Sequence, residues 1–279
     1  MLNGSTSSYE VLNFGVGGYD VLQEVALLEH RGVAYRPDLV VVGFCLNDVG
    51  IASPNLHYLQ RIQEYQSNVI FRLRLAWYVA SQIDRIRLGK WMNEKNRPEV
   101  FERDFKGRIA PISQDERELR ELMRSVPEKH PSVWYSSDQR VGRLRYAFEH
   151  LADLARREKF SVVIVIFPWL EGDATHYPHR AAHRIVAHEA QRAGFDVIDV
   201  LQDFMDAGIR SLRVSERDLI HPNEKGHRIV AEKLSEYVRE KRRQPNIEWQ
   251  SSPNTRLRAT RYSRVRAVTL DAGSRFRGG

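Results

Sequence analysis

Two strongly apolar runs restrict the fold of this chain more than any other feature. The segments 38–45 (DLVVVGFC) and 160–168 (FSVVIVIFP) are short, rich in valine and isoleucine, and bounded by turn residues. Continuous apolar runs of this length are typical of parallel strands that are buried on both faces. Two further runs, 9–16 and 195–200, predict strands of the same kind, the second shorter and more mixed. We therefore expect a parallel β-sheet.

Amphipathic patterns lie between these runs and predict helices. One begins near Val21 and is ended by Gly32, and apolar residues recur at spacings of three and four through 139–158. Two more helices are predicted over 179–193 and 223–243. Alternation of strands and helices favours an α/β fold with helices on both faces of the sheet.

Two parts of the chain break this alternation. The interval 50–138 is too long for an ordinary connection, so we expect an insertion that packs over the sheet edge or the site. Within it, 69–88 is apolar yet basic; we interpret it as a packed amphipathic helix, with a lid or membrane contact as the alternative. The segment 244–279 lacks periodicity and predicts a disordered tail, which leaves 9–243 as the folded domain.

The charge of the chain is concentrated in that tail. The net charge is +7, and residues 244–279 hold seven arginines against two acidic residues, so the rest of the chain is nearly balanced. The tail has few interleaved aromatic residues, and we expect no nucleic-acid partner. No early run resembles a signal peptide and no apolar run approaches the length of a membrane span. These patterns assign neither a compartment nor an oligomeric state.

The sequence predicts no metal site and no cofactor. The single cysteine, Cys45, excludes an intrachain disulfide and a cysteine-rich metal site, and we expect it in the core. Four histidines gather between 176 and 188, two of them at the i, i+4 spacing of a metal pair, but no suitable carboxylate motif accompanies them. We interpret this cluster as a solvated helix face. Its members are His176, His179, His183 and His188.

Three short motifs follow predicted strands or open a predicted helix, which would bring them to one edge of the sheet. They are NFGVGGYD with Gly18, GFCLNDV with Asn47, and DLIHPNE with Asp218 and His221. Open α/β sheets bind their ligands at the carboxyl ends of the strands. A backbone N–H at the first motif and a side-chain amide at the second could donate hydrogen bonds to a developing oxyanion.

The third motif suggests an acid–base relay. Pro222 keeps His221 out of helical geometry, so the imidazole is expected at a junction between loop and helix. Asp218, three residues earlier, can reach one imidazole nitrogen, fix the tautomer and stabilise an imidazolium. Such a pair is the relay half of a nucleophilic hydrolase site.

These motifs resemble those of the SGNH, or GDSL-type, esterase/lipase family. Gly18 matches the oxyanion glycine, Asn47 matches the Gly-x-Asn-Asp-like block with one extra residue, and DLIHPNEKGH matches the Asp-x-x-His block. The resemblance covers 9–243 apart from the insertion. It implies a three-layer α/β/α sandwich with a flavodoxin-like parallel sheet. It also implies hydrolysis of a small-molecule carboxylic ester or O-acetyl ester.

The family's Gly-Asp-Ser block, which carries the nucleophile after the first strand, has no match in this chain. Ser5, Ser7 and Ser8 precede the run 9–16, so they should lie at the opposite edge of the sheet. We therefore expect a truncated hydrolase that lacks its first, central strand and its nucleophile, and that is inactive or impaired. The alternative is a non-catalytic protein that binds an acylated ligand or a membrane surface.

Overall fold

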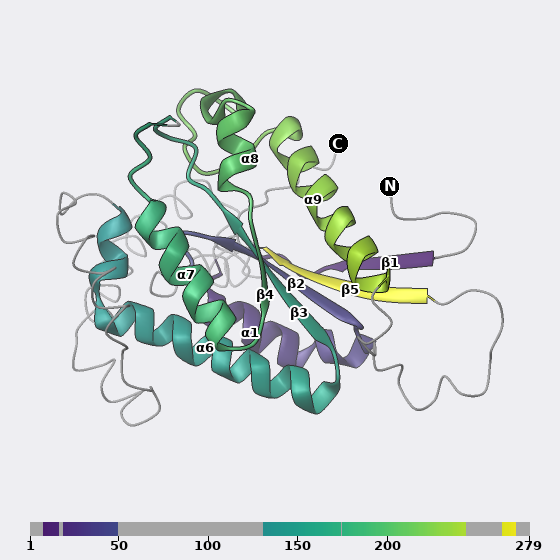
Figure 1. The fold of residues 1–279 in the computed structure, drawn as a ribbon. Helices are drawn as coiled ribbons and strands as arrows, with labels where there is room; N and C mark the ends of the chain where they lie inside the picture. Colours follow the sequence, from purple (N-terminus) through teal and green to yellow (C-terminus); the bar gives the residue numbers. More distant parts are fainter. Residues whose placement is uncertain (1–7, 17–18, 50–130, 174, 244–263, 272–279) are drawn as a thin grey trace, which may run out of the picture.

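The computed structural model describes residues 8–16, 19–49, 131–173, 175–243 and 264–271 (Figure 1). Five parallel strands form one sheet in the order β1-β5-β2-β3-β4. The strands are β1 (Ser8–Asn13), β2 (Leu39–Cys45), β3 (Ser161–Phe167), β4 (Asp196–Asp199) and β5 (Arg264–Asp271). The four strands predicted from the sequence are thus present, and all five run in one direction.

The described helices lie on both faces of this sheet (Figure 1). The α-helices are α1 (Val21–His30), α6 (Asp138–Glu158), α7 (Arg180–Arg192), α8 (Leu201–Asp206) and α9 (Glu224–Arg243). Short 3-10 helices are η1 (Gly32–Tyr35), η3 (Pro131–Ser136) and η4 (Ile209–Leu212). The predicted helices 21–31, 139–158, 179–193 and 223–243 are confirmed to within one residue at their ends, and α8 was not predicted.

Alternate residues of the central strands enter two separate cores. Val40, Val42 and Phe44 of β2 face one core with α1, α6 and α7, whereas Leu39 and Val41 face the other with α8 and α9. Side chains alternate between the faces of a strand, so a strand that is apolar throughout is covered on both sides. The predicted three-layer α/β/α architecture is confirmed.

The carboxyl-terminal strand β5 lies where the sequence analysis predicted a missing strand. It pairs with β1 along Ser8–Asn13 and with β2 from Leu39 to Gly43, so no gap separates β1 from β2 (Figure 1). Val268 and Leu270 are buried in the core shared with α1 and α6. For Arg264–Asp271 the prediction of a disordered tail is therefore wrong: an extended segment satisfies the backbone donors and acceptors of two neighbouring strands at once.

Polar side chains fix where the principal helices begin. The Asp20 carboxylate accepts a hydrogen bond from the backbone N–H of Gln23, whose side chain bonds back to Asp20, which makes a capping box at α1. Asn223 Oδ1 accepts from the N–H groups of Lys225 and Gly226 at the start of α9. The α9 cap holds the loop that carries His221.

The proposed insertion lies almost entirely outside the described residues, as do the segment 69–88 and the rest of the tail. Among the residues that the structure describes, no helix is long and apolar enough to cross a membrane. Cys45 is buried at the end of β2, as expected for a core residue.

Candidate active site

A tight loop between η4 and α9 carries the Asp-x-x-His motif. Its two sides are joined by backbone hydrogen bonds from Val214 N–H to His221 O (3.1 Å) and from Asn223 N–H to Leu212 O (2.7 Å). The Asn223 side chain adds a bond to Arg213 O (3.1 Å). Because α9 begins immediately after this loop, its cap and the loop's cross-links hold His221 at one place.

Asp218 and His221 meet directly. His221 Nδ1 lies 2.8 Å from Asp218 Oδ2 and 3.0 Å from Oδ1. A carboxylate is only an acceptor, so Nδ1 carries the proton in this pair and Nε2 is the nitrogen left to accept one. The imidazole is 41% exposed and the carboxylate 26%, which leaves Nε2 in reach of a ligand from solvent. The predicted pairing is present with the geometry of a relay.

The environment keeps the Asp218 carboxyl ionised. Partial burial on its own would raise the pKa of Asp218, but the backbone N–H groups of His221 (2.9 Å) and Ile220 (3.0 Å), together with the imidazole, lower it below the usual value. Hydrogen bonds to the charged form favour that form. Asp218 is therefore available as a fixed anion beside the imidazole at neutral pH.

A shallow pocket of about 480 Å³ opens beside this pair. Its described lining comes from the Asp218 loop and from Trp169, two residues after the end of β3. The position of Trp169 places the pocket at the carboxyl edge of the sheet, where open parallel sheets bind their ligands. The lining residues from the loop are Ser215, Arg217, Asp218, Leu219, Ile220 and His221.

Asn47 lies at the same edge, in the turn after β2. Asp48 fixes this turn through its carboxylate, which accepts from Cys45 N–H (2.7 Å), and Tyr135 donates its hydroxyl to Leu46 O (2.9 Å). Asn47 Oδ1 is buried and has no hydrogen-bond partner in the structure described. The described lining of the pocket beside His221 does not include Asn47, and Gly18 lies outside the described residues.

Two of the clustered histidines are buried, which contradicts the predicted solvated helix face. His179 and His183 are 1% and 2% exposed, and both bond to carboxylates: His179 Nε2 lies 2.6 Å from Glu171 Oε1, and His183 Nδ1 lies 2.8 Å from Asp199 Oδ1. The sequence signal that was missed is the apolar surroundings of His183, which shares its helix with buried alanine, isoleucine and valine residues, while His179 directly precedes that helix. The described residues contain no cluster suited to a metal ion.

Comparison with known families decides how this arrangement is interpreted. The model of the GDSL-like lipase/acylhydrolase family matches residues 2–229, most of the chain. The chain belongs to this family. The predicted SGNH/GDSL resemblance is confirmed, and with it ester hydrolysis as the activity of the family and esters as its substrates.

Other comparisons add little to this assignment. No curated protein matches the GDSL-like chain. A crystal structure of a protein from Lactobacillus plantarum is similar at 16% identity and a TM-score of 0.28. That match covers 35% of this chain and 53% of the other protein, so the chain spans about half the length of the structure it matches.

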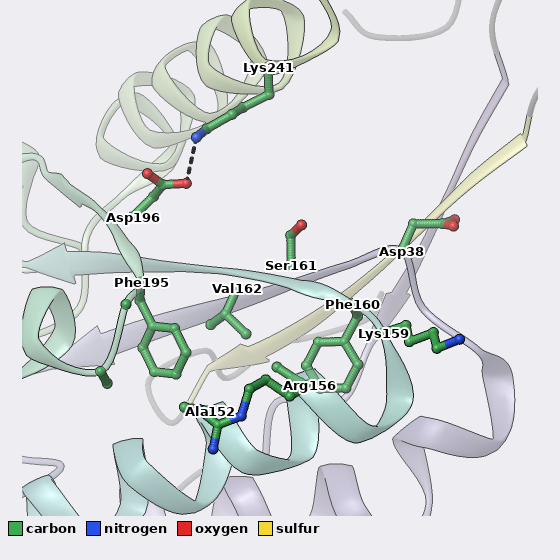
Figure 2. Close-up of a pocket in the computed structure, with 13 residues that line it drawn as sticks. Asp38, Ala152, Arg156, Lys159, Phe160, Ser161, Val162, Phe195, Asp196 and Lys241 are labelled. Carbon is green, nitrogen blue, oxygen red and sulfur yellow. Dashed lines mark ion pairs between the residues drawn. The ribbon is translucent and has the colours of Figure 1, made fainter. Parts of the chain in front are cut away.

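A second cavity of this GDSL-like chain, about 540 Å³ in volume, lies at the opposite edge of the sheet (Figure 2). Ser161 at the start of β3 borders it, and Lys241 of α9 reaches over it to Asp196, with Nζ 2.8 Å from Oδ2. None of the predicted site residues is among its described lining. The carboxyl edge, not this cavity, is the candidate active site.

Proposed function

We propose that this chain is the acid–base part of an SGNH-type ester hydrolase, with His221 as general base and Asp218 as the group that orients it. The observation that carries the proposal is the bond of 2.8 Å between His221 Nδ1 and Asp218 Oδ2 beside an open pocket. A carboxylate on Nδ1 sets the tautomer that leaves Nε2 basic, and it stabilises the imidazolium formed when Nε2 takes a proton.

In the complete reaction, His221 Nε2 takes the proton of a nucleophilic hydroxyl as its oxygen attacks the ester carbonyl. The same proton then passes to the departing alcohol oxygen, and water repeats the cycle on the acyl intermediate. Gly18 and Asn47 are proposed as donors to the oxyanion. In Asn47 the donor would be the side-chain Nδ2, because the amide oxygen can only accept a hydrogen bond.

The nucleophile is the part of the site that the chain does not supply in the family's usual motif. No Gly-Asp-Ser block occurs in residues 1–279, and we expect activity well below that of a complete hydrolase. Ser274 is the first serine to examine, because it follows the strand between β1 and β2 by three residues in the sequence. The alternative function, binding of an acylated ligand without catalysis, would use the same pocket and would not require His221.

Hydrolysis of p-nitrophenyl acetate tests the proposal. We expect His221→Ala to lower the rate at least about tenfold, since a general base contributes typically 10²–10⁴. His227→Ala is the matched control, because His227 is exposed on the adjoining helix. Equal rates for both variants and the unaltered chain would show that His221 has no catalytic role in this hydrolysis. A fluorophosphonate label followed by mass spectrometry then shows which serine, if any, reacts in a His221-dependent way.

A further inference from the structure

The segment that follows β3 is tied to the loop that carries His221. Leu170 N–H donates to Leu219 O (2.6 Å), and Arg213 Nε donates to Leu170 O (2.6 Å). Leu170, which makes both bonds, directly follows Trp169, and Trp169 lines the pocket beside His221. The wall formed by Trp169 and the relay are therefore parts of one cross-linked unit.

A chain of hydrogen bonds that is buried up to His183 holds the backbone of Trp169 from the other side. The Trp169 backbone N–H donates to the Tyr177 hydroxyl (3.0 Å), which lies 3.1 Å from His183 Nε2. His183 Nδ1 lies 2.8 Å from Asp199 Oδ1. Burial raises the pKa of Tyr177, so the hydroxyl keeps its proton. Because Asp199 only accepts, Nδ1 carries the imidazole proton and the tyrosine donates to Nε2.

Trp169 forms part of the pocket wall, and its indole N–H makes no hydrogen bond in the described part of the chain. Its ring packs against His179, with the ring centroids 5.2 Å apart, and the residue is 8% exposed. Its Nε1 is buried and has no acceptor in the part of the chain that the structure describes. An indole N–H can only donate, and a buried donor without an acceptor destabilises the folded state. Native structures retain few such groups, and each of them calls for an explanation, of which a functional role is one.

We propose that Trp169 is a substrate-contacting residue whose indole N–H donates to an oxygen of the bound ester. Tyr177, His183 and Asp199 are positioning residues that hold it there. This inference rests on the proposed function, because it assigns the ester to the pocket beside His221. The ligand class is a small ester with a carbonyl or ether oxygen able to accept a hydrogen bond.

The test follows the indole signals by NMR while acetanilide, a slowly hydrolysed amide analogue of phenyl acetate, is added. The chain has five tryptophans, and Trp169→Phe identifies the Trp169 signal by its loss. We expect this indole proton to shift saturably downfield. Tyr177→Phe removes the acceptor of the Trp169 backbone N–H and should weaken the binding about tenfold. Tyr177→His supplies a ring nitrogen that can accept a hydrogen bond and should recover part of the binding.

Trp134→Phe is the matched control, because Trp134 stacks with Arg140 in another part of the structure. A Trp169 signal that stays fixed during the titration overturns the inference, whether or not other signals move. Hydrolysis that falls in His221→Ala while the Trp169 signal stays fixed would leave the proposed function intact. A saturable shift without any effect of His221→Ala would instead support a binding role for the pocket.

Discussion

Val268 of β5 pairs with Val40 of β2 in parallel register, and both side chains are fully buried. Residues more than two hundred positions apart in the sequence therefore lie side by side on neighbouring strands of the sheet. The carboxyl-terminal strand is part of the domain core, so the integrity of the candidate site depends on a segment far from its motifs.

Removal of β5 is expected to abolish cooperative unfolding. A chain that ends at Arg243 loses the strand between β1 and β2, and each buried backbone group left unpaired costs about 1–3 kcal/mol against a total stability of about 5–15 kcal/mol. A chain that ends at Asp271 keeps β5 and serves as the control. Thermal unfolding followed by circular dichroism distinguishes them, and identical transitions would show that β5 does not stabilise the sheet.

A single substitution in β5 also tests whether this strand stabilises the sheet. Val268→Asp places an unpaired charge at a fully buried position and is expected to destabilise the fold by about 3 kcal/mol or more. Val11→Asp on β1 is the control, since Val11 is 58% exposed and should change the free energy of unfolding by about 0.5 kcal/mol or less. Urea unfolding measures both. Equal effects of the two substitutions would contradict the buried position of β5.

The ion pair between α6 and α7 is expected to be sensitive to the loss of either partner. Arg145 makes two bonds to Glu189, Nε to Oε2 (3.0 Å) and Nη2 to Oε1 (2.6 Å), and both side chains are almost fully buried. Arg145→Met leaves a buried carboxylate with weakened pairing and should cost about 3–5 kcal/mol in urea unfolding. Arg228→Met breaks an exposed pair with Glu224 and should cost at most about 1 kcal/mol. A cost for Arg145→Met as small as that for Arg228→Met would contradict the buried pair.

The lowered pKa of Asp218 predicts a specific dependence of stability on pH. Its folded-state pKa lies below the unfolded value of about 3.9, so its contribution is complete above that pH and is lost as the pH falls through the lower, folded-state pKa. The difference in unfolding free energy between the unaltered chain and Asp218→Asn should shrink as the pH falls from 5 toward 3. A difference that does not change over this range would show that Asp218 is unpaired in solution. The side chain is a quarter exposed, so the effect is expected to be small.

The sequence predicts the fold where local pattern and burial agree. The runs at β2 and β3 are apolar on both faces, and each is followed by a turn residue, so their type and place follow from composition alone. The local pattern does not predict β5, because arginines occupy two of its first three positions, which is typical of a solvated tail. Only its partners on both sides explain why it is a strand, and those partners are distant in the sequence.

One part of the candidate site is likewise predictable from the sequence, and another part is not. The bond between Asp218 and His221 is predictable because the two residues are three apart and Pro222 fixes the turn between loop and helix. The contribution of Trp169 is not predictable from spacing, because it depends on the register of β3 beside β2 and on the buried partners of Tyr177. The burial of His183 has a signal in the apolar residues around it, but its carboxylate partner Asp199 lies on another element and cannot be predicted from spacing.

The most direct test of the relay is a cycle of Asp218→Ala, His221→Ala and the double variant in p-nitrophenyl acetate hydrolysis. If Asp218 acts through His221, each single variant lowers the rate and the double variant is no slower than His221→Ala alone. Rate losses that multiply in the double variant, or rates equal to that of the unaltered chain, would contradict the account.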